Sequence, residues 1–104
     1  MEQLTTTQLK EKIQNGETFL LDLYATWCGP CKTMLNNLKI ISESDEKRNY
    51  QIYKYDIDSD RDFVIDYLKI RSVPTIKIFK EGNEVFSKSG VMSVSDVLNQ
   101  MSNY

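Results

Sequence analysis

The sequence contains no histidine and two cysteines among its 104 residues. Structural zinc is held mostly by four Cys or His side chains, so a zinc site here would need carboxylates or a second chain. Covalent haem attachment requires a histidine directly after a C-x-x-C pair, and Lys32 stands at that position. Long apolar runs are also absent, since none reaches the roughly 18 residues that a transmembrane helix needs. Metal-binding, haem-binding and membrane-spanning proteins are therefore not expected.

Neither sign of charge dominates the chain. It has 13 Lys and Arg against 15 Asp and Glu, a formal net charge of −2, and no basic stripe that would bind nucleic acid or a membrane surface. Residues 1–6 show neither the basic start nor the apolar segment of an export signal, so we expect a cytoplasmic protein. With 40% hydrophobic residues, the chain can form the core of one domain, which is expected to span 1–104. Nothing in the sequence requires a state larger than a monomer.

Strand-like and helix-like apolar patterns alternate along the chain. Residues 18–25 are apolar almost throughout, as in a buried central strand, with Asp22 in the middle. Thr5 and Gln8 predict a capping box at a helix start. A charged stretch, 44–49, precedes the next strand. The predicted strands are 2–4, 18–25, 50–57, 75–79 and 84–89, and the predicted helices begin near residues 5, 30, 63 and 93. This order predicts a mixed sheet covered by helices.

The two cysteines enclose a Gly-Pro dipeptide between a buried strand and a predicted helix start. Unpaired N–H groups and the positive end of the helix dipole favour a thiolate there, so Cys28 is the expected nucleophile. Cys31, one turn into the helix, suits a resolving thiol that attacks a mixed disulfide at Cys28. A disulfide closing so small a loop stabilises a fold poorly, which favours redox chemistry. Cysteines that merely fill a core are the alternative, and Gly29, Pro30 and Trp27 argue for an exposed, shaped turn instead.

Several separate motifs occur in the order known from one family. They are WCGPCK after LLDLYAT, then KYDIDSD, then YLKIRSVPTIKIFKEGNEV. Over about 18–101 the chain resembles the thioredoxin family. The resemblance implies an α/β thioredoxin fold, a central mixed sheet of four or five strands flanked by helices on both faces. It also implies a redox-active Cys28–Cys31 disulfide with no other cofactor, disulfide-containing client proteins, and electrons from a thioredoxin reductase, usually a flavoprotein that uses NADPH.

Two charged residues match family positions near the cysteine pair. The resemblance implies that Asp22 is buried behind the pair and accepts the proton of Cys31, and desolvation should raise the pKa of such a carboxyl towards neutrality. A carboxylate held in a structural salt bridge is the alternative. Lys54, on the adjacent predicted strand, matches the family lysine that lies near this aspartate. A solubilising lysine at a sheet edge is the alternative for Lys54.

The resemblance also implies a client-contact surface around the cysteines. Val73 and Pro74 match a family segment in which the proline is cis and faces the cysteines, leaving backbone for an extended client segment. At Gly90 the missing side chain permits close approach of a client backbone, although a simple turn glycine is the alternative. The expected contact residues are Trp27, Gly29, Pro30, Val73, Pro74 and Gly90.

Some positions depart from the family or from other motifs. Asn36 stands in the active-site helix where most members have a kinking proline, so a straighter helix is expected. Tyr24 replaces the usual tryptophan two residues after Asp22. The run 56–60 is similar to the opening of a calcium-binding loop, but Arg61 replaces its glycine and no closing glutamate follows, which excludes calcium there.

These observations together predict a protein-disulfide reductase that contributes to cell redox homeostasis. The Gly-Pro dipeptide resembles the reducing branch of the superfamily, whereas a histidine between the cysteines is common in the oxidising branch. Two alternatives stay open. One is a disulfide oxidase or isomerase, and the other is a non-catalytic binding subunit that uses the same surface.

Overall fold

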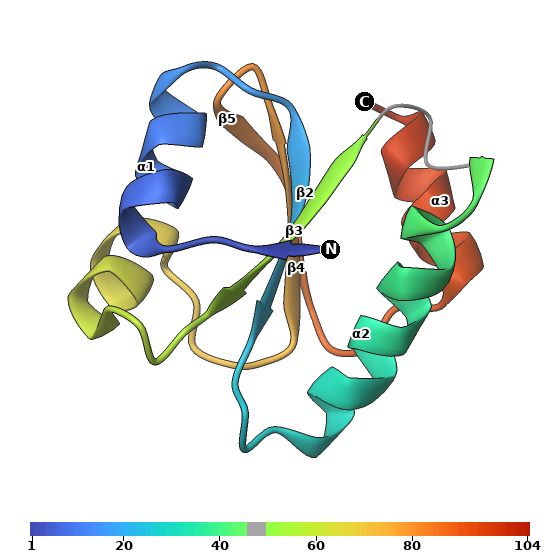
Figure 1. Ribbon diagram of the computed structural model, residues 1–104, viewed down its shortest axis with the longest axis horizontal. Coiled ribbons are helices and arrows are strands. Elements are labelled where there is room, and N and C mark those ends of the chain that lie inside the picture. The colour runs from blue at the N-terminus through green and yellow to red at the C-terminus, as the bar shows by residue number, and fades with distance from the viewer. Residues whose placement is uncertain (46–49) are drawn as a thin grey trace.

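The computed structural model describes residues 1–45 and 50–104, and its centre is a five-stranded mixed sheet (Figure 1). The strands are β1 (Glu2–Gln3), β2 (Phe19–Tyr24), β3 (Gln51–Asp56), β4 (Thr75–Lys80) and β5 (Asn83–Ser89), in the spatial order β1-β3-β2-β4-β5. β3 runs parallel to β1 and β2, while β4 is antiparallel to β2 and β5. The predicted mixed sheet is confirmed. Of the charged stretch 44–49, residues 46–49 lie outside the described residues.

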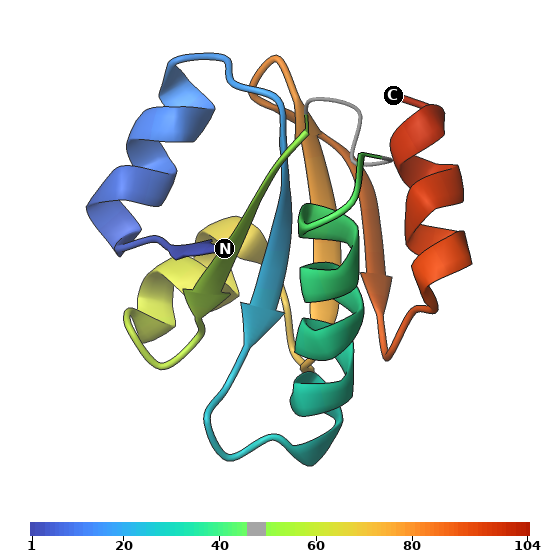
Figure 2. The same ribbon diagram turned by 45° about the vertical axis from the view of Figure 1, so that its right-hand side comes forward.

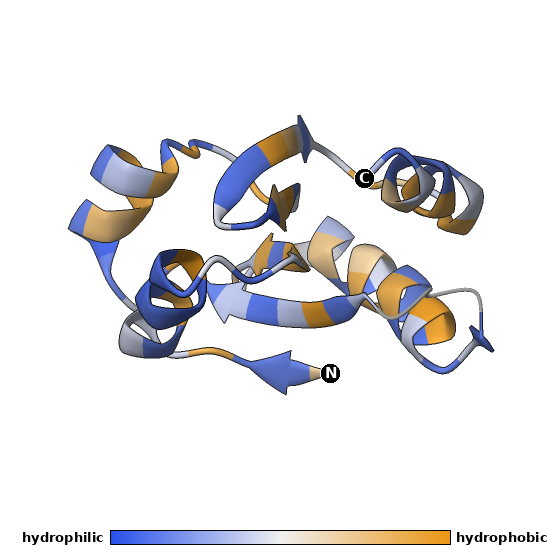
Figure 3. Ribbon diagram, turned by 90° about the horizontal axis from the view of Figure 1, so that it is seen from above, coloured by the Kyte–Doolittle hydropathy of each residue, from blue (hydrophilic) through white to orange (hydrophobic). Residues whose placement is uncertain are grey.

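Helices cover both faces of the sheet (Figure 2). α1 (Thr6–Gln14) and the π-helical segment η2 (Phe63–Leu68) lie on one face, and α2 (Gly29–Ser42) and α3 (Val94–Ser102) lie on the other. Each pair packs its apolar residues against the strands, and Figure 3 shows hydrophobic and hydrophilic residues on different sides of the same helices. The sheet therefore separates two apolar layers.

The alternation of side chains along a strand decides which layer each residue enters. On β2, Leu21 and Leu23 pack in the layer of α1, while Leu20 packs in the layer of α2. Asp22 is two residues after Leu20 on the same strand, so its side chain points to the same face, and its carboxyl lies on the α2 face of the sheet. In the register, Asp22 is opposite Lys54 of β3 and Ile76 of β4. The buried carboxyl thus lies on the face where α2 carries the cysteines.

Local hydrogen bonds explain where two helices begin. Thr5 Oγ1 accepts a hydrogen bond from the Gln8 N–H, and the Thr5 N–H donates to Gln8 Oε1, so the predicted capping box is confirmed. Ser93 caps α3 by accepting from the Asp96 N–H at 3.1 Å. These caps satisfy backbone groups that have no partner inside the helix.

The turn between β4 and β5 requires a glycine at position 82. Gly82 has a φ of +81°, a conformation that L side chains rarely adopt. A Cβ atom at this position would lie 2.5 Å from the backbone oxygen of Ile13, so the turn also lacks space for a side chain. The close approach fixes the β4–β5 hairpin against the end of α1.

The segment after β3 differs in its geometry from the expected helix. Apolar residues at 63, 64, 67 and 68 predict a helical turn, and the structure has a π-helix over Phe63–Leu68. It ends at Lys69, whose φ of 57° is left-handed. The Phe63 and Tyr67 rings stack with centroids 5.1 Å apart. Because this apolar spacing fits either helix type, the pattern could not distinguish them.

Candidate active site

The two cysteines lie at the start of α2 and are joined by a disulfide, with Cα atoms 5.4 Å apart. Cys28 is the N-cap residue, and its Sγ accepts a hydrogen bond from the Cys31 N–H at 3.2 Å. Pro30 occupies the first turn, where no intrahelical N–H partner is needed. Both sulfurs are shielded, since Cys28 is 6% and Cys31 4% exposed. The positive end of the helix thus faces the sulfur of Cys28 and stabilises its thiolate relative to the thiol.

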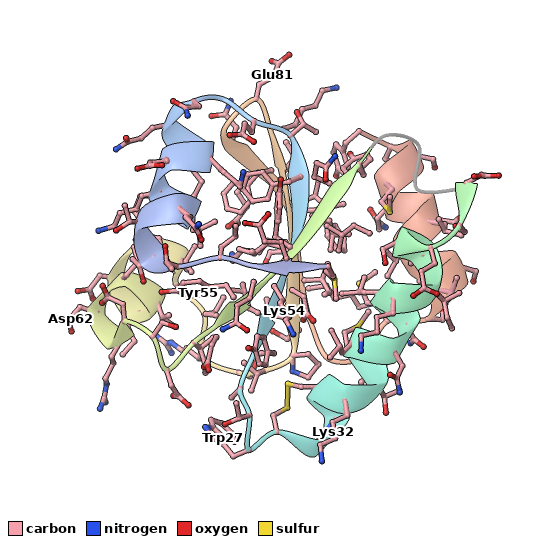
Figure 4. The ribbon with its side chains drawn as sticks, in the orientation of Figure 1. Trp27, Lys32, Lys54, Tyr55, Asp62 and Glu81 are labelled. Carbon is pink, nitrogen blue, oxygen red and sulfur yellow. A yellow bond between two sulfur atoms is a disulfide. The ribbon has the colours of Figure 1, made fainter. Side chains whose placement is uncertain are left out.

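Three separate loops meet at the disulfide. Cys28 and Cys31 pack with Ala25 and with the half-buried side chains of Tyr24, Ile57 and Val73. These neighbours come from the ends of β2 and β3 and from the segment before β4. Figure 4 shows the disulfide as a yellow bond close to Trp27 and Lys32. The cysteines therefore lie at the edge of the sheet where the parallel strands β2 and β3 end.

The segment before β4 leaves main-chain groups open beside the cysteines. The Val73–Pro74 peptide bond is cis. Val73 lies outside every helix and strand. Among residues 1–45 and 50–104, its N–H and C=O form no hydrogen bond with another main-chain group. The Gly90 N–H donates to the Pro74 oxygen at 2.8 Å, which joins the loop after β5 to this segment. Gly90 has a φ of +95° and open space where a Cβ would be.

Trp27 is the most exposed large apolar side chain beside the disulfide, with 68% of its surface accessible. Its indole Nε1 donates a hydrogen bond to Asp58 Oδ2 at 2.9 Å. Sequence reasoning missed Asp58 as a partner of the site. The sequence pattern holds no direct signal for this contact, because it depends on the parallel pairing of β2 and β3, which brings the loops after both strands to one edge of the sheet.

Asp22 is fully buried in the middle of β2. Among the described residues, neither of its carboxyl oxygens has a hydrogen-bond partner. Burial raises the pKa of Asp22 from 3.8 to about 7, and the positive charge of Lys54 acts in the opposite direction. The Lys54 Nζ lies 5.6 Å from the centre of the Tyr24 ring. A carboxyl with this pKa can hold or release a proton near neutral pH.

The residues singled out in the sequence fall into two groups in the structure. Asp22 and Lys54 lie opposite each other on neighbouring strands, on the α2 face of the sheet. The surface group surrounds the disulfide and consists of Trp27, Gly29, Pro30, Val73, Pro74 and Gly90. Gly29 and Pro30 are exposed in the first turn of α2, and Pro74 is buried against the loops.

Aspartates at the end of β3 and in the segment that follows it stabilise this part of the chain. Asp56 Oδ1 accepts from the Asp58 N–H at 2.9 Å, and Asp60 Oδ1 accepts from the Phe63 N–H at 3.1 Å. In the part of the chain that the structure describes, no three His, Cys, Asp or Glu side chains gather as a metal site would require. These carboxylates therefore act as acceptors for turn and helix N–H groups.

One protein family accounts for both the cysteine pair and the five-stranded sheet. The model of the thioredoxin family matches residues 1–103. The chain belongs to the thioredoxin family. A thioredoxin of Rickettsia felis is 34% identical over 89 residues, which cover 86% of this chain and 83% of that relative. Thioredoxin Asp f 29 of Aspergillus fumigatus is 38% identical over 77 residues, 73% of this chain and 69% of the relative.

Solved thioredoxin structures share the fold over nearly the whole chain. The thioredoxin Mala s 13 of Malassezia sympodialis superposes with a TM-score of 0.83 at 25% identity, covering 98% of this chain and 90% of that one. Oxidised mitochondrial thioredoxin 3 of Saccharomyces cerevisiae gives a TM-score of 0.81 at 25% identity, covering 100% and 95%. The thioredoxin fold expected from the motifs is confirmed.

Family membership and the C-x-x-C pair together identify the chemistry of the chain. The chain is a thiol–disulfide oxidoreductase, and its relatives support protein-disulfide reductase activity. Thioredoxins function without a bound cofactor, because the redox-active disulfide is part of the protein. No helix among the described residues has the length and apolar character needed to cross a membrane.

Proposed function

We propose that the chain reduces disulfides of client proteins and that Cys28 is the attacking residue. The observation that carries this proposal is the position of the Cys28 sulfur, which caps α2 and accepts the Cys31 N–H. The Cys28 thiolate attacks one client sulfur, a mixed disulfide forms, and the other client sulfur leaves as a thiolate. Cys31 then attacks the Cys28 sulfur and releases the first client sulfur. Two electrons pass to the client, and the Cys28–Cys31 disulfide forms.

Asp22 assists the second step by accepting the proton of the Cys31 thiol. The support is its burial on the α2 face and a pKa of about 7, which matches a general base at neutral pH. Lys54 acts through Asp22, since its positive charge opposes the effect of burial on that pKa. Lys54 is therefore a positioning and tuning residue rather than a reacting one.

The surface group around the disulfide binds the client segment that carries the attacked cysteine. Val73 has an open main chain beside the disulfide, so an extended segment can pair with it as an added strand. The exposed indole of Trp27 offers apolar contact, and Gly90 leaves room for a client backbone. Gly29, Pro30 and Pro74 complete the surface without adding charge.

Turnover requires that the Cys28–Cys31 disulfide be reduced again. The electron donor in this proposal is a thioredoxin reductase, a flavoprotein that takes electrons from NADPH, since the family implies such a partner. In this proposal the protein acts as a monomer in the cytoplasm, within the dithiol and disulfide balance of the cell, as its membership of the thioredoxin family favours. No further cofactor takes part.

A single-turnover assay tests the proposal. The reduced protein is mixed with a peptide that contains one disulfide, and the appearance of peptide thiols is followed over time. We expect reduction that the Cys28→Ser variant lowers by more than about 10³-fold, because serine cannot form the mixed disulfide. The matched control is the double variant Cys28→Ser/Cys31→Ser, which should bind the peptide and leave its disulfide intact. Peptide binding by the wild type without any reduction would instead indicate a non-catalytic binding subunit.

A further inference from the structure

A groove of about 650 Å³ opens beside the client-contact surface. It lies between the loop after β3, the π-helical segment η2 and the segment before β4. Its apolar lining comes from Ile57, Val64 and Ile70 and from the exposed Ile65. A hollow lined in this way accepts an apolar side chain.

The groove is continuous with the site around the disulfide. Ile57 lines the groove and also packs against the cysteine cluster. Asp58, another lining residue, accepts the hydrogen bond of Trp27. Ser72 lines the groove directly before Val73 in the chain. A client segment extended over Val73 therefore lies next to the groove.

Two arginines outnumber the single carboxylate among the side chains that line the groove. Arg61 and Arg71 both line it and both are exposed. In the described ranges, neither forms a salt bridge with an Asp or Glu side chain. The one carboxylate in the lining, Asp58, already accepts the Trp27 indole N–H. The guanidinium groups are thus available to an external carboxylate, which arginine binds through two parallel hydrogen bonds.

We propose that Arg61 and Arg71 select client segments that carry an aspartate or glutamate close to the attacked cysteine. This inference rests on the proposed reduction of client disulfides. An extended segment advances about 3.3 Å per residue, and Arg71 lies two residues before Val73, so the acidic residue falls about two to four positions from the cysteine. The apolar lining takes a neighbouring side chain, and the arginines hold the carboxylate.

Three disulfide peptides that differ at one position test this inference. Glutamate, glutamine or lysine stands about three residues from the attacked cysteine, and the reduced protein is the reductant in each reaction. We expect the second-order rate constant to fall in the order Glu, Gln, Lys, with about threefold to tenfold between the first and the last at low salt. Added salt should shrink this ratio, because the arginines are exposed to solvent.

Matched variants assign the preference to the groove. The double variant Arg61→Gln/Arg71→Gln should bring the Glu to Lys rate ratio close to one, and Arg71→Glu alone should reverse the preference. The control Lys39→Gln/Lys80→Gln removes the same charge from exposed positions outside the groove and should keep the wild-type ratio. Equal rates for the three peptides, or a ratio that survives in the arginine variants, would overturn the inference. Failure of the wild type to reduce any of the peptides would overturn the proposed function itself.

Discussion

Replacing Asp22 with asparagine is expected to stabilise the protein by about 2 to 4 kcal/mol at mildly alkaline pH. The folded protein must bury an ionised carboxylate that has no hydrogen-bond partner among the described residues. The rise of the Asp22 pKa from 3.8 to about 7 corresponds to about 4 kcal/mol once the group is fully ionised. A buried amide also lacks partners, which reduces the gain. In a domain of this size, the melting temperature should increase by about 10 °C or more.

The gain should depend on pH in a defined direction. Because the folded pKa of this carboxyl is raised, the wild type loses stability as the pH rises above 3.8, and the loss levels off above about 7. The Asp22→Asn variant lacks this dependence, so the two proteins should converge near pH 4. Chemical denaturation at several pH values measures the difference. Asp62→Asn, which removes an exposed carboxylate, is the control and should change stability by less than about 0.5 kcal/mol. A less stable Asp22→Asn protein, or a gain independent of pH, would contradict this account.

The same variant should also slow the second chemical step. Without the carboxyl, the Cys31 thiol loses its proton acceptor, so formation of the Cys28–Cys31 disulfide from a mixed disulfide should slow by about tenfold or more at neutral pH. Attack of Cys28 on the client should change less. A variant that is more stable yet resolves mixed disulfides at the wild-type rate would leave Asp22 with a structural effect and no part in proton transfer.

Replacing Cys31 with serine should trap the client as a covalent adduct. Cys28 keeps its place at the start of α2 and forms the mixed disulfide, but no second thiol remains to attack it. Turnover should fall by more than about 10³-fold, and mass spectrometry should find the protein joined to one client molecule. The matched variant Cys28→Ser should form no such adduct. An adduct on Cys28→Ser and none on Cys31→Ser would exchange the roles of the two cysteines.

Features governed by local sequence could be predicted in detail. The capping pair Thr5 and Gln8, the Ser93 cap and the helix start at the cysteines depend on residues within one turn of each other. The apolar run around Asp22 identified a buried strand, because few other positions tolerate such a sequence. The motifs shared with the thioredoxin family then implied that this strand belongs to a central mixed sheet.

Features that depend on sheet register could not be predicted from the pattern alone. The Trp27–Asp58 hydrogen bond joins loops 31 residues apart, and it forms because β2 and β3 are parallel neighbours. Lys77 is a further example, since it lies within an apolar strand and is 3% exposed. Its ammonium group is paired with Glu84 and Ser87 of β5, partners that the β4–β5 register supplies. A shift of one residue in either strand would turn these side chains to the opposite face.

The reduction potential of the Cys28–Cys31 pair tests the central claim most directly. The protein is equilibrated in dithiothreitol redox buffers, its thiols are trapped, and the oxidised fraction is followed together with Trp27 fluorescence. A reductase requires a potential well below that of protein disulfide isomerase, so we predict a value under about −230 mV. A value near or above about −180 mV would contradict the account and indicate a disulfide oxidase or isomerase, and the absence of a reversible couple would indicate a binding protein.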